Sequence, residues 1–204
     1  MDFMKIPSKL LAIDTATKSI YLALIIDGVV IESINQEGAS NHSVTIMPLI
    51  DQLLRKQSLN LRMIDGVLVG IGPGSYTGVR IGVAIAKMIG YLNPIEVYSF
   101  SSLALLATVS NSEHILAYID ARRGNAFLST FFQKNGVISI DLEDSLLNFD
   151  EFRKSLSVSY EEVCQGMPNI LKLINSGLLK KVEDIHALVP NYLQITEAER
   201  NKVV

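Results

Sequence analysis

Two aspartates directly follow apolar segments of the sequence and are the strongest candidates for chemistry. Asp14 follows the apolar run at residues 10–13, and Asp120 follows a similar run. A carboxylate at the end of a strand can hold Mg²⁺ through water, and two of them could orient a nucleotide across a cleft. Aspartate also caps turns through side-chain hydrogen bonds. Both interpretations stay open for Asp14, whereas the adjacent Arg122 and Arg123 favour the capping role for Asp120.

A glycine-rich segment, GPGSYTGVRIG at residues 72–82, is the second candidate. Backbone N–H groups that precede a helix attract anions. The spacing, however, matches neither the P-loop G-x-x-x-x-G-K-[ST] nor the dinucleotide fingerprint G-x-G-x-x-G. A tight strand-to-helix turn, in which glycine avoids clashes, is the alternative. We therefore expect at most a nucleotide or anion contact, and the residues expected to make it are Asp14, Thr15, Gly72, Gly74 and Ser75.

Other reactive side chains occur in weaker patterns. Ser75 lacks the nucleophile-elbow pattern because Pro73 stands where that pattern requires glycine. The three histidines lie on separate segments without metal-ligand spacing, and a single cysteine, Cys164, excludes disulfides and thiolate-rich metal sites. We expect no metal site, and a hydrolase mechanism is disfavoured.

Hydrophobic patterning predicts the elements that position these residues. Strands are expected at residues 10–13, 19–26, 29–35, 65–71 and 95–98, and helices at 43–56, 79–92 and from Ser101 or Ser102 to about 109. Asp27-Gly28 predicts a two-residue hairpin, because both central residues of a type I′ turn need a positive φ. The order βββαβαβα forms a first unit, residues 1–110, of ordinary domain size.

The pattern of the first unit then restarts. Tyr21 lies seven residues after Asp14, and Phe127 lies seven residues after Asp120. Asn135-Gly136 repeats the hairpin signal of the first half. This internal repeat predicts a second, related subdomain at residues 111–204 that is truncated and ends in a polar tail. Two unrelated hairpins are the alternative interpretation. After residue 142 we expect short helices at 149–156 and 168–174 and a strand at 158–163.

Composition limits the class of protein. The chain has 204 residues, 49% of them hydrophobic, and a formal net charge of -3. This composition predicts a folded, soluble protein with a large core, and the weak negative charge disfavours holding a polyanion without help. We expect no targeting segment, and no membrane-spanning segment because the most apolar long stretch, residues 79–92, is too short for a bilayer. The single cysteine fits a reducing cytoplasm.

The helix predicted at residues 79–92 carries small residues four apart, at Gly78, Gly82, Ala86 and Gly90. Small side chains on one stripe let another helix approach closely. The stripe could face the chain's own sheet or a second subunit. Under the second interpretation, Gly82→Leu would disrupt pairing and leave the fold intact.

Several of these motifs together resemble the TsaB (YeaZ) family over nearly the whole chain. They are LAIDTAT at residues 11–17, His42-Ser43, the GPGSYTGVRIG segment, residues 99–103, IDARR at 119–123 and PNYL at 190–193. The resemblance implies an actin-like (ribonuclease H-like) α/β fold with two related subdomains. It also implies a non-catalytic subunit of the complex that places threonylcarbamoyl on the adenosine beside the anticodon in tRNAs reading codons that start with A.

The resemblance further implies the partners and the contact surface. Catalysis would belong to a TsaD-like subunit and ATP hydrolysis to a TsaE-like ATPase, so ATP and Mg²⁺ would be used by the assembled complex and not by this chain. The chain alone would pair with itself, and tRNA would be contacted only indirectly. The contact surface would lie on the helices at 43–56 and 77–92, with Met47, Ile50, Gly78, Arg80, Gly82, Val83, Ala86 and Gly90 as its expected residues.

Departures from related patterns refine this expectation. The catalytic TsaD-like partner holds metal through H-x-x-x-H, but Ile46 stands four residues after His42, and no Gly-Gly pair of the adenosine-binding kind occurs. Val44, Phe127 and Gln194 replace the residues usual in the TsaB pattern. A stand-alone ATP-dependent phosphotransferase that uses Asp14 and Asp120 is the alternative function.

Overall fold

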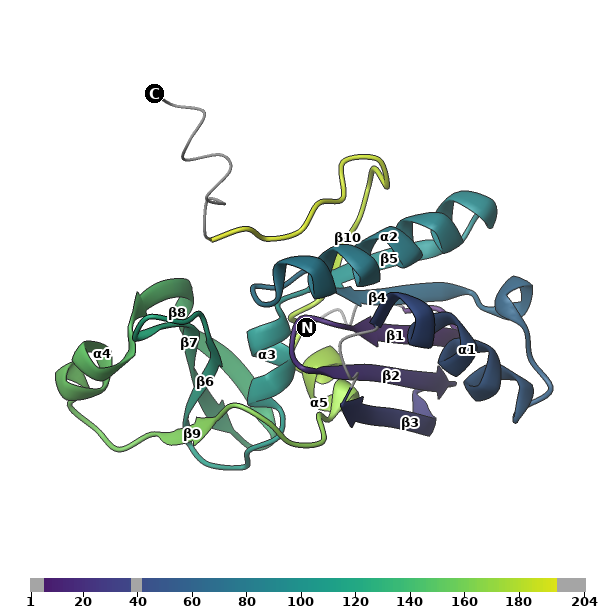
Figure 1. Ribbon diagram of the computed structural model, residues 1–204. Helices are drawn as coiled ribbons and strands as arrows, with labels where there is room; N and C mark the ends of the chain where they lie inside the picture. The colour runs from purple at the N-terminus through teal and green to yellow at the C-terminus, as the bar shows by residue number, and fades with distance from the viewer. Residues whose placement is uncertain (1–5, 38–41, 194–204) are drawn as a thin grey trace, which may run out of the picture.

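A computed structural model describes residues 6–37 and 42–193, which form two β-sheets with helices between and around them (Figure 1). The first half contains β1 (Lys9–Asp14), β2 (Ser19–Ile26), β3 (Val29–Glu37), α1 (His42–Arg55), a 3₁₀ turn (Leu61–Met63), β4 (Gly66–Gly70), α2 (Tyr76–Leu92), β5 (Glu96–Phe100) and α3 (Ser102–Ala107). The second half contains β6 (His114–Asp120), β7 (Asn125–Lys134), β8 (Val137–Asn148), α4 (Phe149–Ser155), β9 (Glu161–Val163), α5 (Ile170–Asn175) and β10 (Lys180–Lys181).

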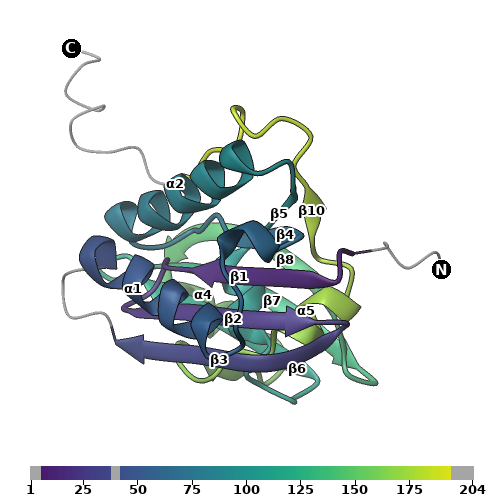
Figure 2. The same cartoon turned by 90° about the vertical axis from the view of Figure 1, so that its right-hand side faces the viewer.

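The first sheet has the strand order β10-β5-β4-β1-β2-β3. Its strands β1, β2 and β3 form an antiparallel meander, whereas β4 pairs parallel with both β1 and β5. Every residue of β4 is buried, as expected for a parallel strand covered on both faces. The crossover helices α1 and α2 lie side by side on one face of this sheet (Figure 2).

The second sheet has the order β8-β7-β6-β9. Helices α3 and α5 lie between the two sheets, and one apolar core joins both sheets to these helices. A second core lies under α1 and α2, and a smaller one lies between the second sheet and α4. The side chains of β6 alternate between two of these cores, with Ile115 and Ala117 facing the first sheet and Leu116 facing α4.

Both predicted hairpin turns are confirmed. Asp27 and Gly28 have φ values of 49° and 77°, and Asn135 and Gly136 have 53° and 76°. These left-handed conformations are the ones that a type I′ turn requires. The strand β8 runs to Asn148, and β9 covers only Glu161–Val163 of the strand expected at 158–163.

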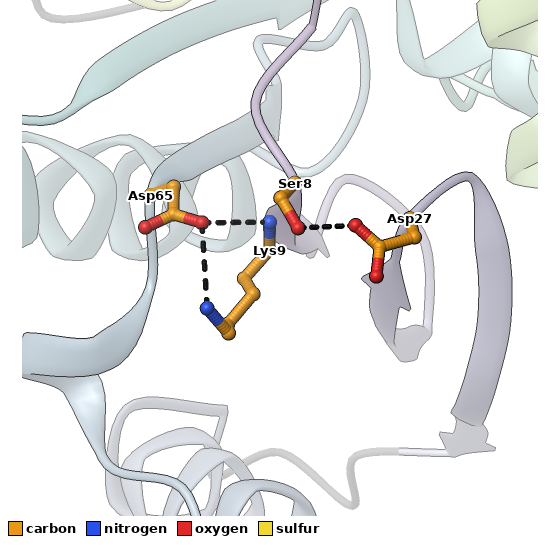
Figure 3. Close-up of polar contacts among 4 residues, drawn as sticks. All are labelled: Ser8, Lys9, Asp27 and Asp65. Carbon is orange, nitrogen blue, oxygen red and sulfur yellow. Dashed lines mark hydrogen bonds and ion pairs between the residues drawn. The ribbon is translucent and has the colours of Figure 1, made fainter.

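Polar contacts hold the start of β1, at the opposite end of this strand from Asp14 (Figure 3). The Ser8 hydroxyl donates to the Asp27 carboxylate in the first hairpin turn. The Lys9 amide donates to Asp65 Oδ2 at 3.0 Å, and the Lys9 ammonium lies 3.8 Å from the same oxygen. Because these side chains are partly exposed, we assign the contacts a role in strand alignment and little net stability.

Residues 180–193 return to the first sheet and correct the predicted domain division. The strand β10 pairs antiparallel with β5, and the Val182 amide donates to the Val97 carbonyl at 2.9 Å. Leu188 is buried in the core under α1 and α2, and Ile185 packs against it. These residues were expected in the second subdomain, since a two-residue strand carries no periodic signal. In the described part of the chain, no helix is long and apolar enough to span a bilayer.

Candidate functional site

The glycine-rich loop lies directly on the turn that follows β1. The Ser75 amide donates to the Ala16 carbonyl at 2.7 Å, and the Thr15 hydroxyl donates to the Gly78 carbonyl at 2.7 Å. The Ser75 side chain caps α2 by accepting from the Gly78 amide at 3.2 Å. The five residues expected to contact an anion therefore come together, but several of their polar groups are already used inside the chain.

Two glycines permit this close approach. A Cβ atom at Gly74 would lie 2.3 Å from the Ala16 carbonyl oxygen, and one at Gly78 would lie 2.1 Å from the Thr15 carbonyl oxygen. Real Cβ atoms do not approach backbone oxygens so closely. Thr15 and Gly72 are buried as well, so the structure favours the tight-turn interpretation over an anion cradle.

Asp14 is buried at the end of β1, with 4% of its surface exposed. Its Oδ1 accepts from the Ala16 amide at 2.7 Å, whereas its Oδ2 has no hydrogen-bond partner in the described chain. Burial raises the pKa of the Asp14 carboxyl, and the nearby Ser102 hydroxyl and the Ala16 amide oppose this effect only in part. Ser102 Oγ accepts from the Gly72 amide at 3.1 Å and makes no hydrogen bond of normal geometry to Oδ2.

Asp120 does not face Asp14. Asp14 lies on the same face of β1 as Leu10 and Ala12, toward the core between the sheets, whereas Asp120 lines a shallow hollow of about 210 Å³ with Tyr118 and Phe149 on the α4 side. Asp120 Oδ1 accepts from the Arg122 amide at 2.8 Å, so it caps its own turn. The predicted pair of carboxylates across a cleft is absent from the described chain.

The two hairpins differ by one residue in their pairing register, which explains why Asp120 does not face Asp14. Asp14 pairs with Tyr21, but Asp120 pairs with Ala126, and Phe127 pairs with Ile119. Tyr21 and Phe127 both face the core between the sheets. The position that corresponds to Asp14 in side-chain direction is therefore Ile119, because a slip of one residue reverses the face of every side chain in a strand.

The described chain contains no group of three or more His, Cys, Asp or Glu side chains that could hold a metal ion. Ile46, at the position of the second histidine in the H-x-x-x-H pattern, is fully buried in α1. A buried isoleucine offers no metal ligand at this position.

Comparisons with known proteins give the family. The family model described as "TsaD: tRNA N6-adenosine threonylcarbamoyltransferase" matches residues 29–197. The tRNA threonylcarbamoyladenosine biosynthesis protein TsaB of Bacillus subtilis is 30% identical, with 93% of this chain and 96% of the relative covered. The TsaB protein of Haemophilus influenzae is also 30% identical, with 84% and 70% covered. The chain belongs to the TsaB family, within this wider TsaD-type group.

A solved structure agrees with this assignment. YeaZ from Pseudomonas aeruginosa superimposes with a TM-score of 0.77 at 21% identity and covers 92% of this chain and 100% of its own. At this identity the likeness concerns the fold alone. It confirms the predicted actin-like (ribonuclease H-like) α/β fold.

The small-residue stripe of this TsaB-family chain faces its own sheet and not a partner. A Cβ atom at Gly82 would lie 2.6 Å from Thr15 Oγ1, and one at Gly90 would lie 2.4 Å from Ile185 Cδ1. Ile50, Val83 and Ala86 are buried in the core under α1 and α2. Gly78 and Gly82 are buried as well, whereas Gly90 is half-buried. Burial within the chain therefore disfavours the expected subunit contact at Ile50, Gly78, Gly82, Val83 and Ala86, and that contact stays a prediction. Of the expected contact residues, Arg80 is exposed and Met47 is half-buried.

The outward side of α2 carries a different set of residues. Met88, Tyr91 and Leu92 are 43%, 71% and 70% exposed, and Ala84 is exposed as well. A shallow hollow of about 220 Å³ lies beside Met88 and Tyr91 and is completed by Lys87, Ile185 and His186. We call Ala84, Met88, Tyr91 and Leu92 the outer face. The sequence indicates such a surface, because α2 is apolar nearly all round and therefore has more apolar faces than its own sheet covers.

The remaining family departures fall in different places. Val44 is exposed at the start of α1, Phe127 is buried between the sheets, and Gln194 lies outside the described residues.

Arg80 contacts one residue far away in sequence and one on its own helix. Its Nε donates to the Tyr192 hydroxyl at 2.6 Å, and its guanidinium lies 3.7 Å from the centroid of the Tyr76 ring. Tyr192 was not among the expected site residues, since a residue in an irregular segment has no periodic pattern.

Proposed function

We propose that this TsaB-family chain is a non-catalytic subunit in the synthesis of threonylcarbamoyladenosine in tRNA. In this role it pairs with a TsaD-like catalytic subunit and works with a TsaE-like ATPase. The modified base would be the adenosine next to the anticodon in tRNAs that read codons starting with A.

The observation that carries the proposal is the outer face of α2. Large apolar side chains that are exposed together on one helix are typical of a surface that binds another protein. Met88 and Tyr91 lie one turn apart on α2, and Tyr91 belongs to a residue type enriched at interface hot spots. We infer that the catalytic subunit, or a second copy of the chain when it is alone, covers this face.

The position of the aspartates supports a non-catalytic role. A phosphotransferase of the alternative kind needs Asp14 and Asp120 on the same cleft, but their side chains lie toward different cores. We propose that the assembled complex uses ATP and Mg²⁺ through its other subunits. With a net charge of -3, the chain would contact tRNA only indirectly, and we propose a cytoplasmic location.

Charged substitutions on the outer face should disrupt the complex and leave the fold intact. Met88→Glu and Tyr91→Glu place an unpaired carboxylate in an apolar contact, which should weaken binding to a purified TsaD-like subunit by at least tenfold. Sizing chromatography at micromolar concentration measures the loss, and circular dichroism checks the fold.

Val158→Glu is the matched control, because Val158 is similarly exposed at 47% but lies between α4 and β9. The proposal is contradicted if the wild-type chain forms no complex, or if the outer-face variants bind as well as the control.

A further inference from the structure

The hollow beside Met88 and Tyr91 is built by two segments that are distant in sequence. One wall is α2, and the other is the turn at residues 184–188, which we call the returning turn. In Figure 2 the yellow segment that follows β10 bends back beside α2. Because Ile185 and His186 of this turn complete the hollow, the surface around it is not a property of α2 alone.

Lys87 of α2 makes two polar contacts with the returning turn. Its ammonium donates to the His186 carbonyl at 2.9 Å and to the Leu188 carbonyl at 3.1 Å. Hydrogen bonds from a charged donor are stronger than those between neutral groups, and Lys87 is half-buried, which shields them in part from water. Two such bonds into one turn restrict both its position and its orientation on α2.

Further contacts hold the side chains of the turn at the hollow. Ile185 packs against the core under α1 and α2, and a Cβ atom at Gly90 would lie 2.4 Å from its Cδ1 atom. The Asp184 carboxylate accepts from the His186 amide at 2.8 Å and so closes the turn. The His186 ring meets the Tyr91 ring edge-on, with centroids 5.7 Å apart. His186 therefore lies beside Tyr91, at the end of α2 that carries the outer face.

We infer that Lys87 is a positioning residue for the partner surface: it holds the returning turn on α2 and thereby completes a hollow that takes a large apolar side chain of the catalytic subunit. The inference rests on the proposed function. It goes beyond that function because it adds a second segment to the contact surface and names what enters the hollow.

The chemistry of the hollow fits a different protein better than a second copy of the chain. Met88, Tyr91 and Ile185 line it with apolar groups, and anchor side chains at interfaces fill pockets of this kind. Both acceptors of Lys87 are uncharged carbonyl oxygens, which do not neutralise its positive charge. A two-fold contact between copies would bring a second Lys87 into the same contact, whereas a different protein can present a carboxylate there.

Lys87→Met tests the positioning step, because methionine keeps an unbranched apolar side chain but donates no hydrogen bond. The nuclear Overhauser effect between the Tyr91 and His186 rings reports the position of the turn in the full chain. Calorimetry measures binding to a purified TsaD-like subunit. We expect Lys87→Met to lose the ring signal and to weaken binding by at least about tenfold, since two charge-assisted hydrogen bonds are removed. Lys87→Arg keeps a charged donor and should retain both.

Two outcomes overturn the positioning role. If the ring signal persists in Lys87→Met, or is already absent in the wild-type chain, Lys87 does not place the turn. If the signal is lost but Lys87→Met binds within about twofold of wild type, the returning turn is not part of the partner surface.

Adjacent substitutions in the turn test the hollow without changing Lys87, and they decide if Lys87→Met does not fold. His186→Glu places a carboxylate against the apolar lining and should weaken binding to the TsaD-like subunit by at least about tenfold. Ala187→Glu is the matched control, because Ala187 is exposed in the same turn but does not line the hollow, and it should bind within about twofold of wild type. Equal effects of the two substitutions overturn the inference.

The same measurements separate this inference from the proposed function. A wild-type chain that binds no TsaD-like subunit contradicts the proposed function and the named occupant together. If the wild-type chain binds but His186→Glu weakens only self-association, the proposed function stands, a second copy occupies the hollow, and the inference is overturned.

Discussion

At the scale of single residues, the site depends on close approach between backbones. The loop at 72–78 and the turn after β1 touch through carbonyl oxygens, and only hydrogen atoms fit at Gly74 and Gly78. A motif that resembles a phosphate loop here serves to join α2 to β1. A Cβ atom at Gly82 would lie 2.6 Å from Thr15 Oγ1, so Gly82→Leu, expected from the sequence to break only subunit pairing, should instead disrupt the core.

Gly78→Ala tests this explanation because two physical effects predict opposite signs. Helix propensity alone favours alanine by up to about 1 kcal/mol. The Cβ atom would instead lie 2.1 Å from the Thr15 carbonyl oxygen, and overpacking of this kind costs on the order of 2 kcal/mol. We expect a net loss in the free energy of unfolding, measured by urea denaturation.

Thr77→Ala is the control for Gly78→Ala, since Thr77 is the exposed neighbour on α2 and its substitution should change stability by no more than about 0.5 kcal/mol. A Gly78→Ala chain that is more stable than wild type would show that the backbones separate without cost, against our account.

At the scale of elements, local signals predicted most of the fold. The hairpin dipeptides, the periodic helices and the apolar strands of the first half all lie where the sequence placed them. These elements have short-range causes, such as the positive φ of a type I′ turn, that act within a few residues. The return of residues 180–193 has no such cause, because a short irregular segment is held by contacts distant in sequence.

The direction of the Asp120 side chain could not be predicted from the sequence either. Its seven-residue spacing to Phe127 matches that of Asp14 to Tyr21, but Asp120 pairs with Ala126 and not with Phe127. Spacing along the chain fixes neither the pairing register nor the face of a strand. The small-residue stripe shows the same limit, since its spacing predicted that another element packs closely against α2 but not which element.

Adjacent residues in the returning segment should differ sharply in their effect on stability. Leu188 is 7% exposed in the core under α1 and α2, so Leu188→Ala should lower the free energy of unfolding by about 2 to 3 kcal/mol. Val189 is 62% exposed, and Val189→Ala should change it by less than about 0.5 kcal/mol. Urea denaturation compares the two, and equal small effects would show that the segment does not belong to the first core.

At the scale of the whole molecule, the two halves share one core, but their aspartates do not share one site. The core between the sheets joins both halves through α3 and α5, and the position equivalent to Asp14 in the second half is an isoleucine. The pair of carboxylates expected from the repeat is therefore not formed in the described chain. The outer face of α2 is the surface through which we propose that this chain acts.

The most direct test of this account is reconstituted threonylcarbamoylation of tRNA by a TsaD-like subunit and a TsaE-like ATPase, with and without this chain. We predict that the wild-type chain and its Asp14→Asn and Asp120→Asn variants support activity to a similar extent, within about twofold, and that Met88→Glu and Tyr91→Glu reduce it at least tenfold. Loss of activity in the two aspartate variants with the outer-face variants unaffected would contradict the account and assign the chemistry to this chain.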